Sequence, residues 1–346
     1  MSDGTRERRW PLPGDPDASV GTKQHLLPQL HQRYFGNERE MIATVVRATG
    51  ERFVAPIKDT VAERNFYSTA DETGKLDGKS DHLLGWAEAK VAPVIRELVH
   101  GGAFVRFPPA PAARADLCMF LAFQLTRGRY MRRMTEQAGD LYMHLMIPQG
   151  MDRGQAQAWL TARGEDPTDE AVEQVVAASA IMDKVEFMPD PNEHIRHMGP
   201  LALKLYPLLV FRHWYVAEYS VPSLITCDEP VVMIFDDPRR MGRRAGLADA
   251  AEVWFPLSPR HLLILADDGR YGAERRFAAD PGSATEANLR IAANAYETIH
   301  MHPDQDHLAG IEIPEPGPLF RIVEPVEPEL ARRYGKAPAR TRTRRR

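Results

Sequence analysis

The chain has 346 residues and a mass of 39.0 kDa, enough for one large domain or two moderate ones. Hydrophobic residues make up 43% and charged residues 27%, a balance that is typical of globular proteins and excludes wholesale disorder. No apolar run approaches the roughly 20 residues that cross a bilayer, and no signal-peptide pattern opens the chain. The sequence therefore predicts a cytoplasmic protein without a membrane partner. Its two cysteines, Cys118 and Cys227, exclude a disulfide framework or a four-cysteine zinc site.

The charge is unevenly distributed along the chain. The formal net charge is −4, yet residues 332–346 carry eight Lys or Arg and no acid, which leaves −12 on the remainder. A basic tail on an acidic body can bind nucleic acid, and the alternative is a composition bias in a disordered chain end. The negative body argues against a wide basic groove for duplex DNA. The negative charge of the body is compatible with an enzyme that uses a divalent metal.

The first part of the chain contains few strong patterns. Residues 1–22 are rich in Pro, Gly, Asp and Arg and predict a disordered arm. Residues 23–36 are expected to form a short helical or turn element that ends at Gly36. Apolar runs at 41–48 and 52–57 predict strands or short apolar pieces.

Helical patterns follow as far as residue 213. Apolar residues recur every three or four positions over 81–99, and the helix expected over 112–137 is apolar nearly all round between 117 and 125. This second helix is therefore expected to be buried. Further helices are expected over 140–147, 153–163, 168–188 and 192–212.

Short runs rich in Val, Ile, Leu and aromatic residues follow Arg212 and predict a small antiparallel sheet, before a helix at 284–299 and a strand at 319–323. The expected fold class is α+β, with a mostly helical N-terminal two-thirds packed on a small, mainly antiparallel C-terminal sheet. We expect a single domain over 23–325, composed of a helical part (23–213) and a sheet-containing part (214–325), and a basic disordered tail over 326–346.

Three polar residues lie on the two strongest helices. Glu88 flanks the apolar stripe of 81–99, and Gln124 and Arg127 lie on the buried face of the next helix. A buried Arg is costly unless it is paired or reaches a cavity. Arg127 therefore either forms a structural bridge with Glu88 or Glu136, or belongs to a functional site.

Other polar residues interrupt apolar segments. His25 precedes Leu-Leu-Pro, where it either caps and packs or serves a site. Asp228 ends an apolar run before Glu-Pro, a position that either presents a carboxylate to a cleft or makes an Asx-turn. Asn65 and Asn294 are either site residues or local backbone caps, and Ser258 is expected to be a turn residue.

Short catalytic motifs are absent from the sequence. It has no Gly-rich dinucleotide fingerprint, P-loop, Gly-x-Ser-x-Gly elbow or His-Glu-x-x-His pair, which argues against those enzyme classes. Two local histidine clusters occur, at His194 and His197 and at residues 300–307, where five potential metal ligands fall within eight residues. A solvated turn around Pro303 is the favoured interpretation of the second cluster.

A series of motifs resembles a bacterial family catalogued as domain of unknown function 4238. The resemblance covers roughly residues 23–302 and consists, in order, of KQHLLPQLHQRYF, VAERNFY, the helix with Glu88, FLAFQLTRGRYMRR, LITCDEPVV, VWFPLSPRHLLIL and the helix with Asn288 and Asn294. Cys227 stands where Ser is usual in the family, and Glu229 where Asn is common. The resemblance implies a site built from motif residues and does not imply a reaction.

The motif residues suit metal-assisted or general-base hydrolysis of a phosphodiester, as in a nuclease. No Glu-x-Lys pair follows Asp228, so a standard restriction-endonuclease-like core is not expected. The alternative is a non-catalytic ligand-binding protein or a defence or stress sensor. For the hydrolase, the expected catalytic residues are His25, Glu88 and Asp228, the substrate-binding residues are Asn65, Gln124, Arg127 and Asn294, and the ligands of Mg²⁺ or Mn²⁺ are Glu88 and Asp228.

Overall fold

The computed structural model describes residues 23–71, 73, 75–101, 106–236, 246–267 and 270–315. The expected arm at 1–22, the strand at 319–323 and the tail at 326–346 lie outside these residues. The described chain divides into two compact units, one formed by 23–131 and 191–315 and the other by 132–190. No described helix is both long and apolar enough to span a membrane.

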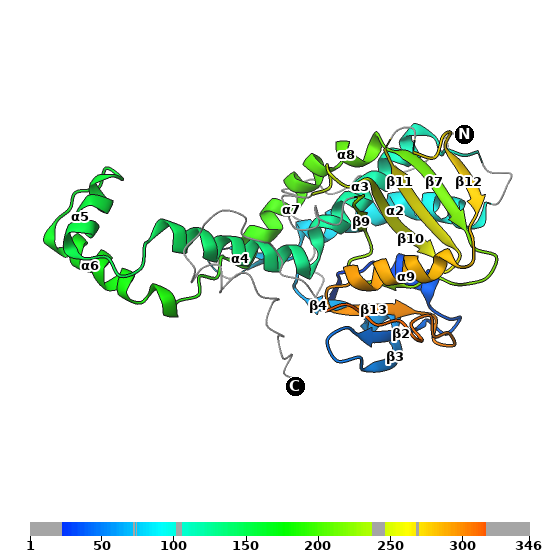
Figure 1. Cartoon of the computed structure of the whole chain (residues 1–346), viewed down its shortest axis with the longest axis horizontal. Helices are drawn as coiled ribbons and strands as arrows, with labels where there is room; N and C mark the ends of the chain where they lie inside the picture. Colours follow the sequence, from blue (N-terminus) through cyan, green and yellow to red (C-terminus); the bar gives the residue numbers. More distant parts are fainter. Residues whose placement is uncertain are drawn as a thin grey trace, which may run out of the picture. The chain divides into compact units, whose positions relative to one another are not determined.

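One antiparallel sheet of the first unit unites strands from both ends of the chain. Its four strands lie in the order β3-β2-β13-β8, of which Figure 1 labels β3, β2 and β13. In this register His300 of β13 lies opposite Thr44 on one side and Thr226 on the other. The strands are β2 (Met41–Val46), β3 (Arg52–Pro56), β8 (Thr226–Cys227) and β13 (Thr298–Met301).

The second sheet of this unit has five strands in the order β12-β7-β11-β10-β9. The β12–β7 pair is parallel and the other pairs are antiparallel. Alternate side chains of β7 enter different cores, because successive residues of a strand point to opposite faces. The strands are β7 (His213–Glu218), β9 (Val232–Ile234), β10 (Glu252–Ser258), β11 (His261–Ala266) and β12 (Arg275–Ala278).

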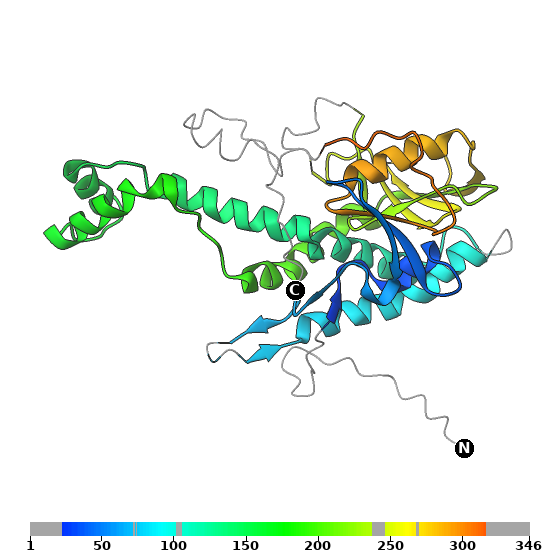
Figure 2. The same cartoon turned by 90° about the horizontal axis from the view of Figure 1, so that it is seen from below.

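Helices cover both faces of the five-stranded sheet. The apolar stripes of α2 and α3 pack on one face in the main core, and α9 packs on the other and also contacts the four-stranded sheet (Figures 1 and 2). The helices of this unit are α1 (Gln29–Phe35), α2 (Lys79–His100), α3 (Pro111–Arg127), α7 (Pro191–Leu205), α8 (Pro207–Val210) and α9 (Ser283–Asn294).

Small elements complete this unit. Strand β1 pairs with β4, which brings the opening motif beside the VAERNFY segment. Strands β5 and β6 form a two-stranded hairpin. These elements are β1 (Lys23–His25), the 3-10 turn η1 (Ile57–Asp59), β4 (Ala62–Arg64), β5 (Thr69–Ala70) and β6 (Leu76–Asp77).

The second unit is helical. Helix α4 begins in the first unit and continues into the second, where α5 and α6 pack together through Ala156, Leu160 and Val172. Asp152 and Gln155 form a capping box at the start of α5, which satisfies two backbone donors that the helix leaves free. The elements are α4 (Arg129–Met146), α5 (Arg153–Thr161), α6 (Asp169–Ala180) and the 3-10 turn η3 (Met182–Lys184).

The expected arrangement of a helical N-terminal block on a C-terminal sheet is wrong. Strands occur at the start, in the middle and near the end of the described chain, and helices alternate with them. The local patterns at 41–48 and 52–57 do predict strands, but β2 pairs with β13 from the opposite end of the fold. Such a pairing depends on long-range packing, which no local sequence pattern reveals.

Candidate functional site

Arg127, the last residue of α3, is held by three separate segments. Its Nε donates to the Tyr67 hydroxyl at 3.1 Å, its Nη1 to Glu88 Oε1 at 2.8 Å and its Nη2 to the His25 carbonyl at 2.6 Å. The side chain is only 4% exposed, so these bonds offset the cost of burying a guanidinium. Of the two partners that the sequence allows for Arg127, the structure places Glu88 beside it.

The surroundings of Arg127 shift the pKa values of its neighbours. Burial raises the pKa of Tyr67 to about 12, so its hydroxyl stays neutral. Burial lowers the pKa of His25, whose Nε2 lies 3.2 Å from the Lys58 carbonyl. We call His25, Tyr67, Glu88 and Arg127 the arginine cluster. Its hydrogen bonds connect β1, the segment after β4, α2 and α3.

Gly128 separates α3 from α4, where the sequence predicts one helix over 112–137. Its backbone is extended (φ −76°, ψ 173°), and a Cβ there would lie 2.0 Å from Glu229 Oε1. That oxygen accepts a hydrogen bond from the backbone N–H of Tyr130 at 3.2 Å. Desolvation, together with the neighbouring Asp228, raises the pKa of Glu229 to about 8. Glu229 is therefore mainly protonated at neutral pH.

Asp228 holds the segment that links α9 to β13. Its carboxylate accepts the backbone N–H groups of Tyr296, Glu297 and Thr298 at 2.9, 2.7 and 3.1 Å. Burial raises the pKa of Asp228, and the three donors partly offset that effect because they favour the charged form. Both carboxylate oxygens of Asp228 therefore accept hydrogen bonds from the backbone of residues 296–298.

Asn294 fixes the turn that carries Asp228. Its amide nitrogen donates to the Glu229 carbonyl at 2.5 Å and to the Val231 carbonyl at 3.2 Å. The same Glu229 carbonyl accepts the thiol of Cys227 at 3.1 Å. Asn294 at the end of α9 thus bonds to the β8–β9 turn, and Asp228 in that turn bonds to the residues that follow α9. Together they hold the two segments side by side.

The two remaining expected site residues occupy different settings. Asn65 is exposed in a turn with φ of 54°, a left-handed conformation that Asn tolerates, and its carbonyl accepts the N–H of Ser68. Gln124 lies one turn before Arg127 and is 3% exposed, and its amide nitrogen has no hydrogen-bond partner among the described residues. The structure brings His25, Glu88 and Arg127 together and places Asn294 against the turn that carries Asp228. The side chains of Asn65 and Gln124 form no hydrogen bond with either group among the described residues.

The expected metal ligands are already engaged by other groups. Glu88 pairs with Arg127, and Asp228 accepts three backbone donors. Over the described part of the chain, no group of three or more His, Cys, Asp or Glu side chains is arranged to hold a metal ion.

A cavity of about 460 Å³ lies at the turn that joins β10 and β11. Three histidines and an arginine line it, contributed by the end of α2, the turn itself and the segment after β13. We call this cavity the histidine pocket. Its polar lining residues are Tyr34, His100, Ser258, Arg260, His261, His302 and Gln305.

Ser258 and His261 form a hydrogen-bonded pair in this pocket. The Ser258 Oγ lies 2.7 Å from His261 Nδ1 and also accepts the backbone N–H of Arg260 at 3.2 Å. Burial lowers the pKa of His261 to about 4, although the charge of Glu218 on the neighbouring strand opposes the shift. The imidazole is therefore neutral at pH 7, and Nδ1 can accept the Ser258 proton when Nε2 carries the ring hydrogen.

Other contacts fix the rest of the lining. Arg260 Nη1 donates to the Ser220 carbonyl at 2.6 Å. The backbone N–H of Asp304 donates to His302 Nδ1 at 3.3 Å, and the ring centroid of His100 lies 5.9 Å from that of Tyr34. Contacts with neighbouring residues therefore fix the side chains of Arg260, His302 and His100 in the lining of the pocket.

Sequence reasoning did not identify this pocket as a site. It treated Ser258 as a turn residue and did not single out His100 or His261. The available signal was the Ser-Pro-Arg-His run, which places a hydroxyl and an imidazole three residues apart across a turn. The histidines of the sequence cluster at residues 300–307 occupy different places in the structure. His300 is buried in the four-stranded sheet, whereas His302 lines the pocket.

Fold and site together define a mixed α/β protein with a histidine-lined cavity beside a strand turn. The chain matches a family model described as a protein of unknown function (DUF4238) over residues 23–305. It therefore belongs to that family, and the resemblance carried by its motifs is confirmed. No curated protein and no solved structure matches the chain.

Proposed function

We propose that this protein is a hydrolase that cleaves phosphate esters, phosphodiesters in particular, in the histidine pocket. The observation that carries the proposal is the 2.7 Å contact between Ser258 Oγ and His261 Nδ1 inside a cavity of about 460 Å³. A hydroxyl paired with a neutral imidazole is the arrangement that activates a serine nucleophile. Pockets of this size also suit small ligands.

The proposed reaction has two steps. Ser258 Oγ attacks the phosphorus atom, its proton passes to His261 Nδ1, and the bond to the leaving alcohol breaks. His261 then gives the proton to the departing alkoxide. In the second step water attacks the phosphorus atom of the phosphoseryl ester and gives a proton to His261. His261 passes this proton to Ser258 Oγ as the Oγ–P bond breaks, which restores the serine hydroxyl and the neutral imidazole.

Charge and donors in the lining favour an anionic substrate. Arg260 supplies a permanent positive charge, and the imidazole rings of His100 and His302 each carry an N–H that can donate a hydrogen bond. A phosphate bound beside His261 also favours the protonated imidazole, which raises its pKa from about 4 toward the working range of a base. Substrate binding itself thus activates the pair.

The arginine cluster and Asp228 have a different role in this proposal. Their polar atoms bind one another or the backbone, so they hold the elements that surround the active pocket. From the sequence, Glu88 and Asp228 are the expected ligands of a divalent metal. The experiment below therefore measures the dependence on metal separately from the dependence on Ser258.

The test uses a panel of RNA, single-stranded DNA, duplex DNA and a chromogenic phosphodiester. Each is incubated with wild-type protein, with the Ser258→Ala variant and with Ser223→Ala, whose hydroxyl donates a hydrogen bond to the nearby Val221 carbonyl. Reactions contain Mg²⁺, Mn²⁺ or a chelator. We expect wild type and Ser223→Ala to cleave at least one substrate, and Ser258→Ala to be slower by about a hundredfold or more.

Two outcomes would contradict this function. One is the absence of turnover by folded wild-type protein on every substrate. The other is full activity in Ser258→Ala. Cleavage that is lost in the chelator and in Glu88→Gln, yet kept in Ser258→Ala, would move the reaction to the residues that the sequence first indicated.

The second candidate is a non-catalytic ligand-binding protein. It is favoured by the complete engagement of Arg127 and Asp228 within the fold, which is what a structural polar network requires. In that case the histidine pocket binds a phosphate ester without turnover. Calorimetric titration with a non-hydrolysable phosphodiester would then give saturable binding that Arg260→Ala weakens, while every hydrolysis assay stays negative.

A further inference from the structure

Ser258, His261 and Glu218 form a row across three neighbouring strands of the five-stranded sheet. Ser258 of β10 is paired with His261 of β11, and His261 is paired with Glu218 of β7. The three strands lie side by side in the order β10-β11-β7 (Figure 1). His261 therefore has a hydroxyl on the strand at one side of it and a carboxylate on the strand at the other.

The side chains of His261 and Glu218 project to the same face of the sheet. Successive side chains of a strand alternate between the two faces. Leu263 of β11 and Val216 of β7 both enter the main core, in which α2 and α3 cover this sheet. His261 lies two residues from Leu263, and Glu218 lies two residues from Val216. Both therefore share the face that α2 and α3 cover.

The pairing of His261 with Glu218 also brings their side chains close together. In an antiparallel pair, hydrogen-bonded positions alternate with non-hydrogen-bonded ones, and facing side chains are closer at the latter. The adjacent position is hydrogen-bonded, because the Tyr219 N–H donates to the Arg260 carbonyl at 2.8 Å. His261 and Glu218 therefore occupy a non-hydrogen-bonded position, where facing Cβ atoms are generally about 4.5–5.5 Å apart.

Arg276 of β12 holds the Glu218 carboxylate. Its Nε donates to Glu218 Oε1, and the Arg276 side chain is only 12% exposed. Glu218 Oε2 forms no hydrogen bond with a described residue, and neither does His261 Nε2. The facing pair therefore retains one carboxylate oxygen and one ring nitrogen for a hydrogen bond to each other.

The charges around His261 act on it in opposite directions. Burial lowers its pKa to about 4, and the Glu218 carboxylate opposes this shift. The positive charges that lower the pKa further are those of Arg276, His100 and Arg260. Glu218 therefore favours the imidazolium that forms when the ring takes the proton of the serine hydroxyl.

We propose that Glu218 is the positioning residue of His261. Its carboxylate, held by Arg276, accepts the Nε2–H of the imidazole, so that Nδ1 stays unprotonated and can take the Ser258 proton. A third group at the second ring nitrogen commonly orients a histidine base in this way. The inference rests on the proposed function of the Ser258–His261 pair. Glu218 acts through His261 and does not itself touch the substrate.

Two substitutions of Glu218 test this role with the chromogenic phosphodiester. Leu has a similar size but neither charge nor acceptor, whereas Asp keeps both. We expect Glu218→Leu to lower kcat by about tenfold or more and to change KM by less than about twofold, because the carboxylate acts on proton transfer and not on binding. Glu218→Asp should recover most of the wild-type kcat. Thermal melting verifies that each variant is folded.

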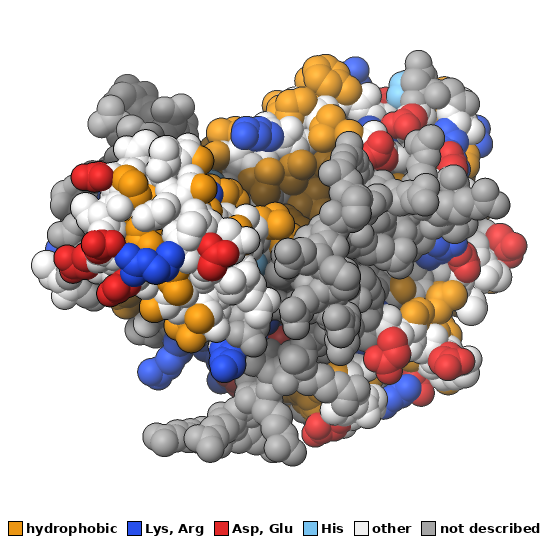
Figure 3. Space-filling model, turned by 60° about the vertical axis from the view of Figure 1, so that its left-hand side comes forward, with side chains coloured by type: hydrophobic (Ala, Val, Ile, Leu, Met, Phe, Trp, Pro, Cys, Tyr) orange, Lys and Arg blue, Asp and Glu red, His pale blue; other side chains and the backbone are white. Residues whose placement is uncertain are grey.

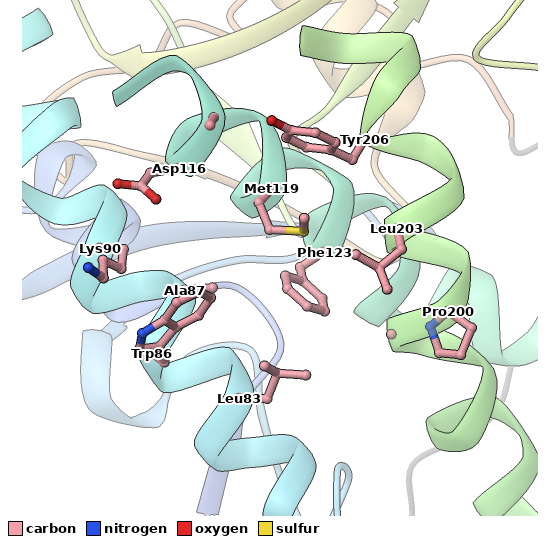
Figure 4. A pocket seen from close by; sticks show the side chains of 12 residues that line it. Leu83, Trp86, Ala87, Lys90, Asp116, Met119, Phe123, Pro200, Leu203 and Tyr206 are labelled. Atoms are coloured by element: carbon pink, nitrogen blue, oxygen red, sulfur yellow. The ribbon is translucent and has the colours of Figure 1, made fainter. Parts of the chain in front are cut away.

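The matched control removes a carboxylate from another cavity of this unit. That cavity has a volume of about 480 Å³ and lies between α2, α3 and α7, with Asp116 and Lys90 at one side (Figure 4). Its other lining residues are mainly apolar. The space-filling view likewise shows a face on which hydrophobic side chains gather around a hollow (Figure 3). An apolar cavity does not suit an anionic ester, so Asp116→Asn should keep the kcat and KM of wild type.

The tautomer of His261 gives a readout that needs no turnover. Nitrogen-15 chemical shifts of the imidazole at pH 7 report which ring nitrogen carries the hydrogen. We expect the Nε2–H tautomer in wild type, Asp116→Asn and Glu218→Asp, and a mixture of both tautomers in Glu218→Leu. Either the wild-type kcat or the wild-type tautomer in Glu218→Leu overturns the proposal. If wild type cleaves no substrate, the hydrolase function fails, and the tautomer alone decides whether Glu218 orients His261.

Discussion

Arg127 shows how one residue can bind three distant segments. Its guanidinium contacts the β1 backbone, the Tyr67 hydroxyl and the Glu88 carboxylate. From the sequence, the buried position of Arg127 and one of its two candidate partners could be predicted, because both follow from helical spacing. The contact with Tyr67 could not, since Tyr67 lies in an irregular segment that is positioned by tertiary packing.

Replacement of Arg127 by Ala should therefore destabilise the protein strongly. The change removes the cation beside the partly exposed Glu88 and takes a donor from the buried Tyr67 hydroxyl and from the His25 carbonyl, and we expect the free energy of unfolding to fall by about 1–3 kcal/mol. Urea denaturation measures it, with Arg153→Ala as the control because the Arg153 pairs with Asp169 and Glu173 are exposed. A loss no larger than that of the control would mean that the arginine cluster does not stabilise the fold.

At the scale of elements, the division between α3 and α4 was not predictable. Apolar spacing runs on through 112–137, and a single Gly is tolerated inside many helices. Gly is required at this break because the space beside Gly128 is filled by the Glu229 carboxyl, which comes from the β8–β9 turn. The helices could be predicted from local pattern, but this interruption depends on a residue distant in sequence.

A Gly128→Ala variant tests that cause. The new methyl group must displace the Glu229 carboxyl from the Tyr130 N–H, and we expect a loss of about 1–2 kcal/mol in the free energy of unfolding. In a Glu229→Ala background the same change should cost almost nothing, because the obstructing side chain is gone. Equal losses in the two backgrounds would show that Gly128 is needed for another reason.

At the scale of the whole molecule, two buried histidines link α1 with the strands of the four-stranded sheet. His31 Nε2 lies 2.8 Å from Thr226 Oγ1, and His300 contacts the hydroxyls of Thr44 and Thr298 at 3.1 and 3.0 Å. The sequence suggested metal binding or a solvated turn around His300 and gave no sign of its burial. It did indicate the family and a mixture of helices and strands, but not the α+β arrangement that was expected from it, and it did not indicate the pairing of β2 with β13 that encloses His300.

These histidines predict loss of stability in acid. Burial lowers the pKa of both His31 and His300 to about 3, whereas the unfolded chain titrates near pH 6.5. The unfolded state therefore binds more protons between these values, and each histidine lowers the unfolding free energy by about 1.4 kcal/mol per pH unit below 6.5. Urea denaturation from pH 7 to pH 4 measures the slope. His300→Gln should reduce it, and an unchanged slope would contradict the assignment of His300 as a neutral buried group.

The central claim, that Ser258 is the nucleophile of a phosphodiester hydrolase, is tested most directly by trapping the covalent intermediate. Wild-type protein is quenched in acid during turnover of the best substrate in the panel, digested and analysed by mass spectrometry. We expect the peptide that contains Ser258 to carry the phosphoryl adduct on that residue, and the Ser258→Ala protein to carry none. Rapid turnover with no adduct on Ser258, together with undiminished activity in Ser258→Ala, would contradict the account.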